Sequence, residues 1–465
     1  MDRGADHYAT GMKIAIVGAG IAGLTCAYTL ERLLRDRGET HHQVTLFEGG
    51  AHFGGHSNTV DVTLPTVRGP VTHGVDTGFL VFNERTYPGL IGLFESLEVP
   101  VARSDMSFAV SLPYLDMEWA GSNLNTVFAQ RRNLLRPRFL AMLGDILRFN
   151  RLTTRLATAS PHDSGLDETV GEFLERHRFG EAFRTWYFLP MAACIWSCST
   201  RQMLDFPIRT MIRFCHNHGL LQISDRPQWM TVQGGSREYV RRMLAHIRDA
   251  RLVKVRGVRR SMTPAAADRT AAASVRIDTD AGAESFDMVV MACHSDQALA
   301  LLQNPTPEER AVLGAIRYQP NRAVLHTDAS LLPARRNVWS AWNYTGRPAT
   351  DDESRLDVCV HYLLNRLQPL PAEWGGRPVI VSLNPLAAPA QHHVVAQFDY
   401  AHPVFDSGAI AAQTHLPRMQ GRYATWFCGA WTAYGFHEDG FQSGLAAAHD
   451  VIRRLSALPD LRGVA

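Results

Sequence analysis

The sequence predicts an α/β plus α+β protein with two domains. Three observations carry this prediction: a glycine-rich turn between an apolar strand and a helix near the N-terminus, a second glycine-rich turn before the last predicted helix, and a length of 465 residues, which is enough for two or three domains with sizeable cores. The N-terminal pattern predicts the α/β part, because strand, helix and strand in succession build parallel sheets that helices cover.

The first strand, loop, helix and second strand carry the signature of a dinucleotide-binding βαβ unit. Lys13 to Val17 is a nearly continuous apolar run, typical of a strand buried on both faces. It leads into a G-x-G-x-x-G pattern, a helical pattern and a second strand that ends in an acidic residue. The residues of this unit that we expect to contact a cofactor are Gly18, Gly20, Ile21, Ala22, Gly23 and Glu48.

Each part of this unit has its own physical reason. The first glycine allows the tight turn, the second lets backbone N–H groups approach a pyrophosphate, and the third lets the helix lie close to its strand. The helix N-terminus brings about half a positive charge to the phosphates. Glu48 is placed to accept hydrogen bonds from ribose hydroxyls, and its charge disfavours a 2′-phosphate. The unit is therefore Rossmann-like and predicts a dinucleotide cofactor.

A second pair of glycines, Gly54 and Gly55, lies a few residues after Glu48. This pair favours FAD over NAD, because another backbone loop can then close over the pyrophosphate. The segment resembles the Glu, spacer, Gly-Gly-Arg signature of the flavin amine oxidase superfamily, which includes monoamine and polyamine oxidases, protoporphyrinogen oxidase and phytoene desaturases. His56 stands where most members carry arginine, and a histidine is charged only near or below its pKa of about 6.5. The resemblance adds four expected FAD contacts, which are Gly49, Gly54, Gly55 and His56.

Four further segments extend the resemblance to the C-terminus. The stretch from Thr425 to Gly444 is similar to the superfamily's Phe-Ala-Gly-Glu/Asp turn and the helix that follows it. A turn at 232–239 and two strands, 252–255 and 286–294, match the segments that return the chain to the FAD domain, and the second strand is expected to close the cofactor sheet. By this match the remaining FAD contacts are Val255, Gly429, Asp439, Gly440 and Phe441, with Ala430 at the usual acidic position.

The resemblance implies a glutathione-reductase-type FAD domain that is discontinuous in sequence. Its expected segments are residues 12–80, 230–300 and 395–460. The substrate domain then takes residues 81–229 and 301–394.

More specifically, the string Phe-Cys-Gly-Ala-Trp followed by Gly-Phe-His-Glu-Asp-Gly resembles a bacterial branch of predicted NAD/FAD-binding proteins associated with modification of membrane fatty acids. This resemblance implies an FAD-dependent oxidoreductase that dehydrogenates an apolar fatty-acyl or membrane-lipid substrate by hydride transfer to flavin N5. Oxidation of amines is an alternative, although only Lys13 and Lys254 could serve as the lysine that many amine oxidases place near N5. A second alternative is a non-catalytic flavin-binding partner of a lipid-modifying enzyme.

Candidate catalytic residues are His437, His361 and Tyr434. His437 is preferred because it lies two residues before Asp439, next to the expected flavin edge. For an isolated histidine, a hydrogen-bonded core or surface position is the competing interpretation. Other polar candidates and apolar walls of a substrate chamber are Asn343, Tyr344, Trp339, Trp342 and Trp431.

Composition excludes several other classes. The formal net charge is +2, so nothing in the overall balance predicts nucleic-acid binding. Seven scattered cysteines, without a signal-peptide pattern or a spanning apolar stretch, favour a reducing, cytoplasmic location. Cys194, Cys198 and Cys215 do not have the spacing of zinc fingers or ribbons, so no metal site is expected.

One basic segment leaves two interpretations open. Between residues 131 and 155, seven arginines alternate with leucine, phenylalanine and methionine at helical spacing. This composition is typical of a helix that lies at a membrane surface. The simpler interpretation is a substrate-domain helix whose arginines face water.

Overall fold

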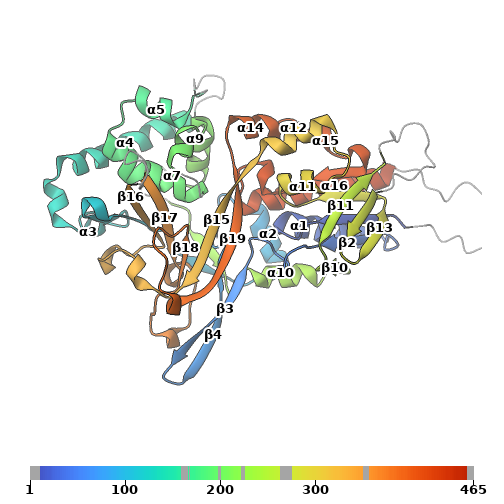
Figure 1. The fold of residues 1–465 in the computed structure, drawn as a ribbon, viewed down its shortest axis with the longest axis horizontal. Helices are drawn as coiled ribbons and strands as arrows, with labels where there is room; N and C mark the ends of the chain where they lie inside the picture. The colour runs from blue at the N-terminus through green and yellow to red at the C-terminus, as the bar shows by residue number, and fades with distance from the viewer. Residues whose placement is uncertain are drawn as a thin grey trace, which may run out of the picture.

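A five-stranded parallel sheet lies at one end of the molecule (Figure 1). The computed structural model describes residues 11–158, 166, 168–196, 200–220, 226–261, 275–348 and 356–457. The strands of this sheet, in spatial order, are β10 (Asp249–Arg251), β2 (Gln43–Phe47), β1 (Lys13–Val17), β14 (Met288–Met291) and β20 (Thr425–Phe427). All of its strand pairs are parallel.

The parallel sheet is buried on both faces, as the apolar run of β1 predicts. Ile14 and Ile16 face a layer of helices, whereas Ala15 and Val17 face a three-stranded antiparallel sheet. The helices of the first layer are α1 (Ile21–Asp36), α10 (Arg237–Leu244) and α16 (His437–Ala457). The antiparallel sheet is formed by β11 (Val255–Arg260), β12 (Val275–Thr279) and β13 (Gly282–Phe286). The Rossmann-like domain is confirmed.

Close contact between the first and last helices brings the two ends of the chain together. A Cβ at Gly440 would lie 2.6 Å from the Ile21 side chain, and one at Gly444 would lie 2.1 Å from the Ala22 carbonyl oxygen. These glycines of α16 therefore allow it to lie directly against the N-terminus of α1.

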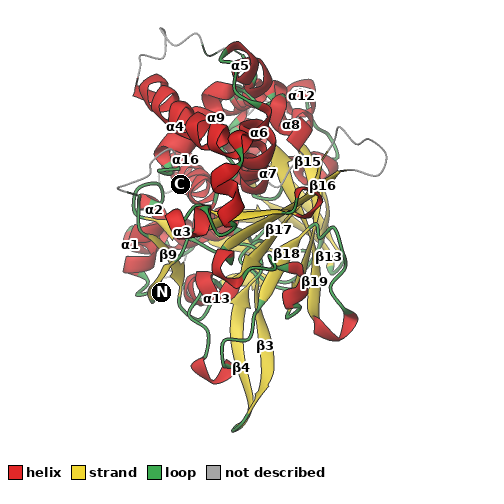
Figure 2. Ribbon diagram, turned by 90° about the vertical axis from the view of Figure 1, so that its left-hand side faces the viewer, coloured by secondary structure: helices red, strands yellow, loops and turns green. Residues whose placement is uncertain are grey.

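A seven-stranded sheet forms the second large unit, and a two-stranded hairpin extends from the molecule below it (Figures 1 and 2). The strands of the seven-stranded sheet are antiparallel except for one parallel pair, β16 with β7. In spatial order they are β19 (Val394–Val404), β15 (Arg317–His326), β18 (Ile380–Leu383), β17 (Leu356–Leu363), β16 (Trp342–Pro348), β7 (Phe108–Leu112) and β8 (Met117–Ala120). The hairpin is β3 (Thr59–Thr66) with β4 (Gly69–Asp76), and a small sheet joins β5 (Phe82–Asn83), β9 (Trp229–Val232) and β6 (Val101–Ser104).

Helices cover one end of the seven-stranded sheet, and most of them lie in the upper part of Figure 2. They are α3 (Leu124–Val127), α4 (Pro137–Thr158), α5 (Val170–Arg176), α6 (Glu181–Phe183), α7 (Leu189–Trp196), α8 (Thr200–Leu204) and α9 (Ile208–Asn217). The remaining helices are α2 (Pro88–Ser96), α11 (Ser295–Leu301), α12 (Pro307–Ala315), α13 (Leu364–Leu367), α14 (Ser407–Gln413) and α15 (Leu416–Met419).

The arginine-rich segment forms two helices instead of one. Residues 131–135 form a 3₁₀ helix, Arg136 is extended, and α4 begins at Pro137. The break has a local cause, because the residue before a proline is driven out of the α region, while proline itself suits the first turn of a helix.

Strand pairing places two of the segments expected in the FAD domain. The strand within 286–294 does not close the cofactor sheet: β14 lies between β1 and β20, because β20 pairs with its outer side. That expectation was wrong. The domain boundaries stay a prediction, and β19, at the start of the segment 395–460, is hydrogen-bonded to β15 of the seven-stranded sheet.

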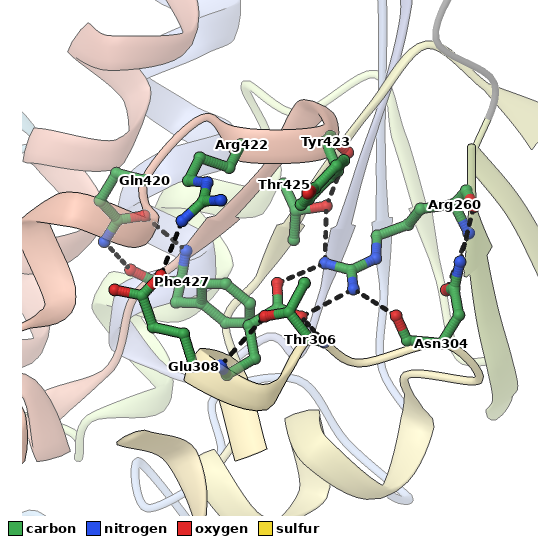
Figure 3. A network of polar contacts seen from close by, with 10 residues as sticks. Arg260, Asn304, Thr306, Glu308, Gln420, Arg422, Tyr423, Thr425 and Phe427 are labelled. Carbon is green, nitrogen blue, oxygen red and sulfur yellow. Dashed lines mark hydrogen bonds and ion pairs between the residues drawn. The ribbon is translucent and has the colours of Figure 1, made fainter. Parts of the chain in front are cut away.

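A buried ion pair fastens the antiparallel sheet to the parallel one (Figure 3). The Arg260 guanidinium donates to both Glu309 carboxylate oxygens at 2.6 and 2.8 Å, and also to the Asn304 carbonyl and Thr425 Oγ1. Thr306 caps α12, which carries Glu309, so the pair joins β11, α12 and β20.

No helix in the described ranges is long and apolar enough to cross a bilayer.

Candidate functional site

One cavity of about 1400 Å³ runs between the parallel sheet and the seven-stranded sheet. Here it is called the large cavity. Its nucleotide end is lined by the glycine-rich turns after β1 and β2, and its other end by apolar side chains of the helical region. The predicted cofactor contacts that line it are Gly18, Gly20, Ile21, Ala22, Glu48, Gly49, Gly54, Gly55, His56, Val255 and Gly429.

The three glycines of the first turn have three separate structural roles. Gly18 has a φ of +105°, and a Cβ there would lie 2.9 Å from the Ala292 backbone. A Cβ at Gly23 would lie 1.8 Å from the Gly18 carbonyl oxygen, so Gly23 allows the helix to approach the turn. A Cβ at Gly20 would meet no atom within 4 Å. Gly20 therefore leaves open the space that a phosphate would fill, at the N-terminus of α1.

Glu48 and the second glycine pair complete this cradle. The Glu48 carboxylate accepts hydrogen bonds from the N–H groups of Ala19 at 2.9 Å and Gly50 at 2.7 Å. The Gly54 N–H donates to the Ala19 carbonyl at 2.8 Å, and a Cβ at Gly55 would lie 3.2 Å from the Gly20 Cα. The two turns thus lie against each other beside the cavity, an arrangement that fits the pyrophosphate of an extended dinucleotide.

His56 lies in a group of aromatic rings that no sequence pattern indicated. Its ring stacks on Tyr400 at 5.0 Å and lies 5.2 Å from His402 and 6.2 Å from His294. Burial and the neighbouring histidines hold the pKa of His56 well below its usual range, so the ring is neutral. Its Nε2 is buried and has no hydrogen-bond partner within the described ranges, so a ligand atom in the cavity can provide one. His56 therefore cannot replace an arginine as a cation.

His437 lines the large cavity at the first turn of α16. Its ring stacks on Phe79 with the centroids 3.8 Å apart, and its Nε2 lies 2.8 Å from Tyr239 Oη and 3.0 Å from Ser57 Oγ. The two hydroxyls are also hydrogen-bonded to each other. Burial lowers the pKa of His437 to about 3, so the imidazole is neutral at physiological pH and serves as a fixed hydrogen-bonding group.

The rest of the C-terminal match is placed differently from the expectation. Tyr434 lines the large cavity, but Asp439, Gly440, Phe441 and, in the first turn, Gly23 do not. The Asp439 carboxylate accepts hydrogen bonds from the backbone N–H groups of Tyr434 and Phe436 and so shapes the turn before α16. Burial raises the pKa of Asp439 to about 6. The residues just before the helix and its first residue, His437, therefore face the cavity, whereas Asp439, in the same first turn, does not.

The structure does not bring His361 to the large cavity. His361 lines a separate, smaller cavity of about 420 Å³ on the other face of the seven-stranded sheet, and its Nδ1 lies 2.6 Å from Ser382 Oγ. Tyr362, the next residue in β17, lines the large cavity instead. Consecutive residues of a strand point to opposite faces, and this alternation separates the two. The expectation that His361 shares a chamber with His437 was wrong.

The other candidates divide in the same way. Trp342 and Trp431 line the large cavity, whereas Trp339 does not. The Asn343 side chain is fully buried and is hydrogen-bonded to Ser340 and to the His361 carbonyl, so its role is structural. Tyr344 is buried in the core beside it.

Sequence reasoning missed three residues that line the large cavity, His294, Tyr400 and His402. It also missed Ser57 and Tyr239, which contact His437. A signal existed for only some of the five. Ser57 lies two residues after the glycine pair, and His294 follows β14 at the carboxyl edge of the sheet, where ligands of α/β folds bind. Tyr239, Tyr400 and His402 come from α10 and β19 and carry no local signature.

Of the three cysteines considered for zinc, Cys215 lies in α9. Cys215 is buried and contacts Met211, and no metal-binding cluster occurs among the residues that the structure describes. Cys198 lies outside the described residues.

Comparison with known proteins identifies the family. Residues 21–341 match the model of the flavin containing amine oxidoreductases. No curated protein matches the sequence. Similar solved structures include a fatty acid isomerase from P. acnes that produces CLA (15% identity, TM-score 0.61, covering 96% of this chain and 99% of that one). A cyclohexylamine oxidase from Brevibacterium oxydans (15%, 0.62, 96% and 100%) and a putrescine oxidase (14%, 0.62, 96% and 99%) are also similar.

These matches give the cofactor as FAD, which the two glycine-rich turns and the open space at Gly20 accommodate. The chain belongs to the flavin-containing amine oxidoreductase family and is an FAD-dependent oxidoreductase.

Proposed function

We propose that this oxidoreductase dehydrogenates an apolar substrate, a fatty-acyl chain. The apolar lining of the large cavity beyond the nucleotide end is the observation that supports this proposal. Side chains of α4, α7 and α9 contribute to it together with tryptophans of three strands. The apolar lining includes Val127, Leu143, Ile146, Met191, Ile195, Phe214, Trp119, Trp229 and Trp342.

The size of the large cavity supports a second ligand beside the cofactor. Sites for single small molecules enclose about 300–1,000 Å³, whereas this cavity encloses about 1400 Å³. A cofactor held along the glycine-rich turns therefore leaves room for a substrate at the apolar end.

The acidic residues of the lining argue against an amine substrate. Among the described residues, Glu48 and Asp105 are the only acidic residues that line the large cavity. Glu48 accepts two backbone hydrogen bonds at the nucleotide end. Asp105 accepts hydrogen bonds from Ser107 and pairs with Arg366. An ammonium group brought into the apolar end would thus have to compete for a carboxylate that is already engaged, and an unpaired buried charge is strongly disfavoured.

The lysines lead to the same conclusion. Lys13 begins β1 and is exposed, and Lys254 lies beside Gly49 at the nucleotide end. The similar structures include a fatty acid isomerase as well as amine oxidases, so this fold accommodates both kinds of substrate, and the lining residues must discriminate between them.

We assign cofactor binding to the two glycine-rich turns, Glu48 and the N-terminus of α1. Bound FAD supplies a two-electron acceptor at N5. The protein then has to bind and orient the acyl chain, exclude water, and hold the polar groups near the ring. The apolar walls perform the first two tasks, and His437, fixed by Ser57, Tyr239 and Phe79, performs the third.

Replacing Gly20 by alanine is expected to lower flavin affinity without damaging the fold. The new methyl group would meet no protein atom within 4 Å, but it would stand in the space assigned to the pyrophosphate. Overpacking of about 1–3 kcal/mol corresponds to about a fivefold to 150-fold loss of affinity. Gly92→Ala, in the exposed face of α2 and likewise free of contacts, is the matched control. Flavin titration monitored by fluorescence measures both; wild-type affinity of Gly20→Ala would contradict the assignment.

His437→Phe is expected to slow flavin reduction about fivefold to 150-fold, since the loss of a buried hydrogen-bonding group costs about 1–3 kcal/mol. The new ring can still stack on Phe79, but Ser57 and Tyr239 lose their partner. Because the pKa of His437 is lowered to about 3, the wild-type rate should show no inflection from this residue near pH 6.5. His449→Phe, an exposed position of the same helix, is the control. Unchanged rates for His437→Phe would remove this residue from the proposed site.

Anaerobic bleaching of the bound flavin tests the function itself. Three sets of substrates are compared: phospholipid vesicles with unsaturated or methylated acyl chains, the corresponding free fatty acids delivered from cyclodextrin, and amines including putrescine and cyclohexylamine. Bleaching by acyl substrates alone is the expected result. Bleaching by amines alone would establish amine oxidation, and an oxidised flavin in every case would contradict the acyl proposal.

A further inference from the structure

Exposed leucines gather around one end of the large cavity. Leu124 in α3 and Leu147 in α4 both line this cavity, and their side chains are 77% and 51% exposed. Leu143 and Ile146, on the neighbouring stripe of α4, continue the apolar lining inward. The large cavity therefore opens to the surface between apolar side chains.

The 3₁₀ helix of residues 131–135 extends this apolar surface. Leu135 is 86% exposed, and Leu134 and Leu140 are also exposed. The 3₁₀ helix contacts α4. We call the five leucines the leucine patch: Leu124, Leu134, Leu135, Leu140 and Leu147. Half of the large apolar side chains that are exposed in the described part of the chain belong to it, whereas exposed leucines are ordinarily scattered singly.

The patch lies in a basic part of the sequence. Residues 124–158 contain seven arginines and one acidic residue, Asp145, although the formal net charge of the whole protein is only +2. Arg132, Arg138 and Arg148 pair with carboxylates. Arg131 and Arg136 donate instead to the neutral side chains of Asn125 and Asn133, which leave their charge in place. Arg151 is exposed, one turn beyond Leu147 on α4.

We propose that the leucine patch and the arginines beside it dock the protein onto an anionic lipid bilayer, with the large cavity opening toward the lipid. Proteins bind to a membrane surface when apolar side chains such as leucine enter the region between head groups and acyl chains. Arginines then lie at the level of the phosphates. The positive charge selects anionic lipids over zwitterionic ones. An acyl chain can then pass from the bilayer into the cavity without crossing water.

The arrangement of the fold agrees with this orientation. Helices α3 and α4 lie at the end of the molecule away from the parallel sheet and the antiparallel β11–β13 sheet (Figure 1). The β3–β4 hairpin points away from them, so it does not stand between the patch and a flat surface. The inference deepens the proposed function, since it names the source of the acyl chain.

Co-sedimentation of the flavin-loaded protein with vesicles tests the docking. Vesicles of phosphatidylglycerol are compared with vesicles of phosphatidylcholine, at low salt, where the screening length is about 30 Å, and at about 1 M salt, where it is about 3 Å. We expect binding to phosphatidylglycerol at low salt and release at high salt. Absence of binding to phosphatidylglycerol vesicles at low salt would overturn the proposal.

Paired variants locate the binding surface. Leu134→Glu/Leu135→Glu should lower vesicle affinity at least tenfold, and Arg131→Gln/Arg151→Gln should lower it about fivefold for each arginine. The control variants are Val67→Glu and Arg68→Gln. They make the same kinds of substitution at the tip of the β3–β4 hairpin, where Val67 is fully exposed. Equal loss in patch and control variants would overturn the assignment, as would a patch variant that changes only the oligomeric state in light scattering.

The docking and the proposed function fail in different ways. Leu134 and Leu135 do not line the large cavity, so their double variant should keep the wild-type rate of flavin bleaching by fatty acid delivered from cyclodextrin. Bleaching by that fatty acid without vesicle binding would refute the docking alone. Vesicle binding without bleaching by any acyl substrate would refute the proposed function alone.

Discussion

Protonation of three buried histidines at about pH 5.5 is expected to remove about 4 kcal/mol from the free energy of unfolding. Three histidines that are buried in the folded chain carry this effect, namely His218, His326 and His361. Burial lowers the pKa of His218 and His326 to about 4 and that of His361 to about 3. One pH unit below the unfolded pKa of about 6.5, each contributes about 1.4 kcal/mol, and whole domains are stable by only about 5–15 kcal/mol.

The sign follows from where the proton binds. Each folded pKa lies below the unfolded value, so between about pH 3 and 6.5 the unfolded chain binds more protons than the folded one. The stabilisation by neutral imidazoles is complete above pH 6.5 and is lost as the pH falls. His402 and His437, whose pKa values burial lowers to about 4 and about 3, act in the same direction. Asp439 opposes them, since burial raises its pKa to about 6.

A directional hydrogen-bond chain explains why two of these rings must stay neutral. The Asp328 N–H donates to His326 Nδ1 at 3.1 Å, so the ring proton belongs on Nε2, which lies 2.6 Å from Ser382 Oγ. Ser382 then donates to His361 Nδ1 at 2.6 Å, and His361 Nε2 can donate to Cys359 at 3.3 Å. A second proton on either ring would place two donors face to face.

Circular dichroism of the flavin-loaded protein during acid titration measures this prediction. His361→Gln keeps a hydrogen-bonding side chain but no titrating group, so its stability should depend less steeply on pH. His392→Gln changes an exposed histidine and is the control, expected to keep the wild-type profile. A flat stability profile between pH 7 and about 5 would show that these buried rings do not control acid unfolding.

Glu309→Ala is expected to destabilise the protein by about 3–5 kcal/mol, because it leaves a buried guanidinium without its counter-charge. The Arg260 side chain is 0% exposed and that of Glu309 is 5% exposed. Both Glu309 carboxylate oxygens accept hydrogen bonds from Arg260, at 2.6 and 2.8 Å, and the substitution removes both bonds together. Chemical denaturation gives the change in the free energy of unfolding.

Two further variants separate loss of the pair from loss of charge. Arg260→Met/Glu309→Leu replaces both partners by apolar side chains and should be less destabilised than Glu309→Ala, since no charge remains buried. Asp280→Ala removes the partner of Arg256 at the surface and should cost less than about 1 kcal/mol. Equal effects of Glu309→Ala and Asp280→Ala would mean that solvent reaches the Arg260 guanidinium.

The cradle for the cofactor is the part of the site that a linear sequence can specify. Gly18, Gly20 and Gly23 act through the backbone of one turn, and Glu48 follows the next strand at the same edge of the sheet. Their roles depend on local geometry, so the spacing was enough to predict that they would line or support the cavity.

The polar wall of the large cavity could not be predicted in this way. Tyr400 and His402 reach His56 because β19 crosses from the seven-stranded sheet, and Tyr239 reaches His437 from α10. No periodicity in the sequence records which segments from different sheets meet. The error at His361 has a related cause. Alternation along β17 puts His361 and Tyr362 on opposite faces of the sheet, but only the packing of that sheet decides which face borders the large cavity.

The sequence by itself determined the Rossmann-like unit, its FAD-type glycine turns and the apolar, arginine-flanked segment of residues 131–155, because each depends on neighbouring residues and their spacing. The tertiary structure alone decided that His56 and His437 are neutral, that Asp439 shapes a turn, and that two leucines of the patch, Leu124 and Leu147, line the large cavity. Burial and the approach of distant strands set these properties, and both arise only when the sheets and helices pack together.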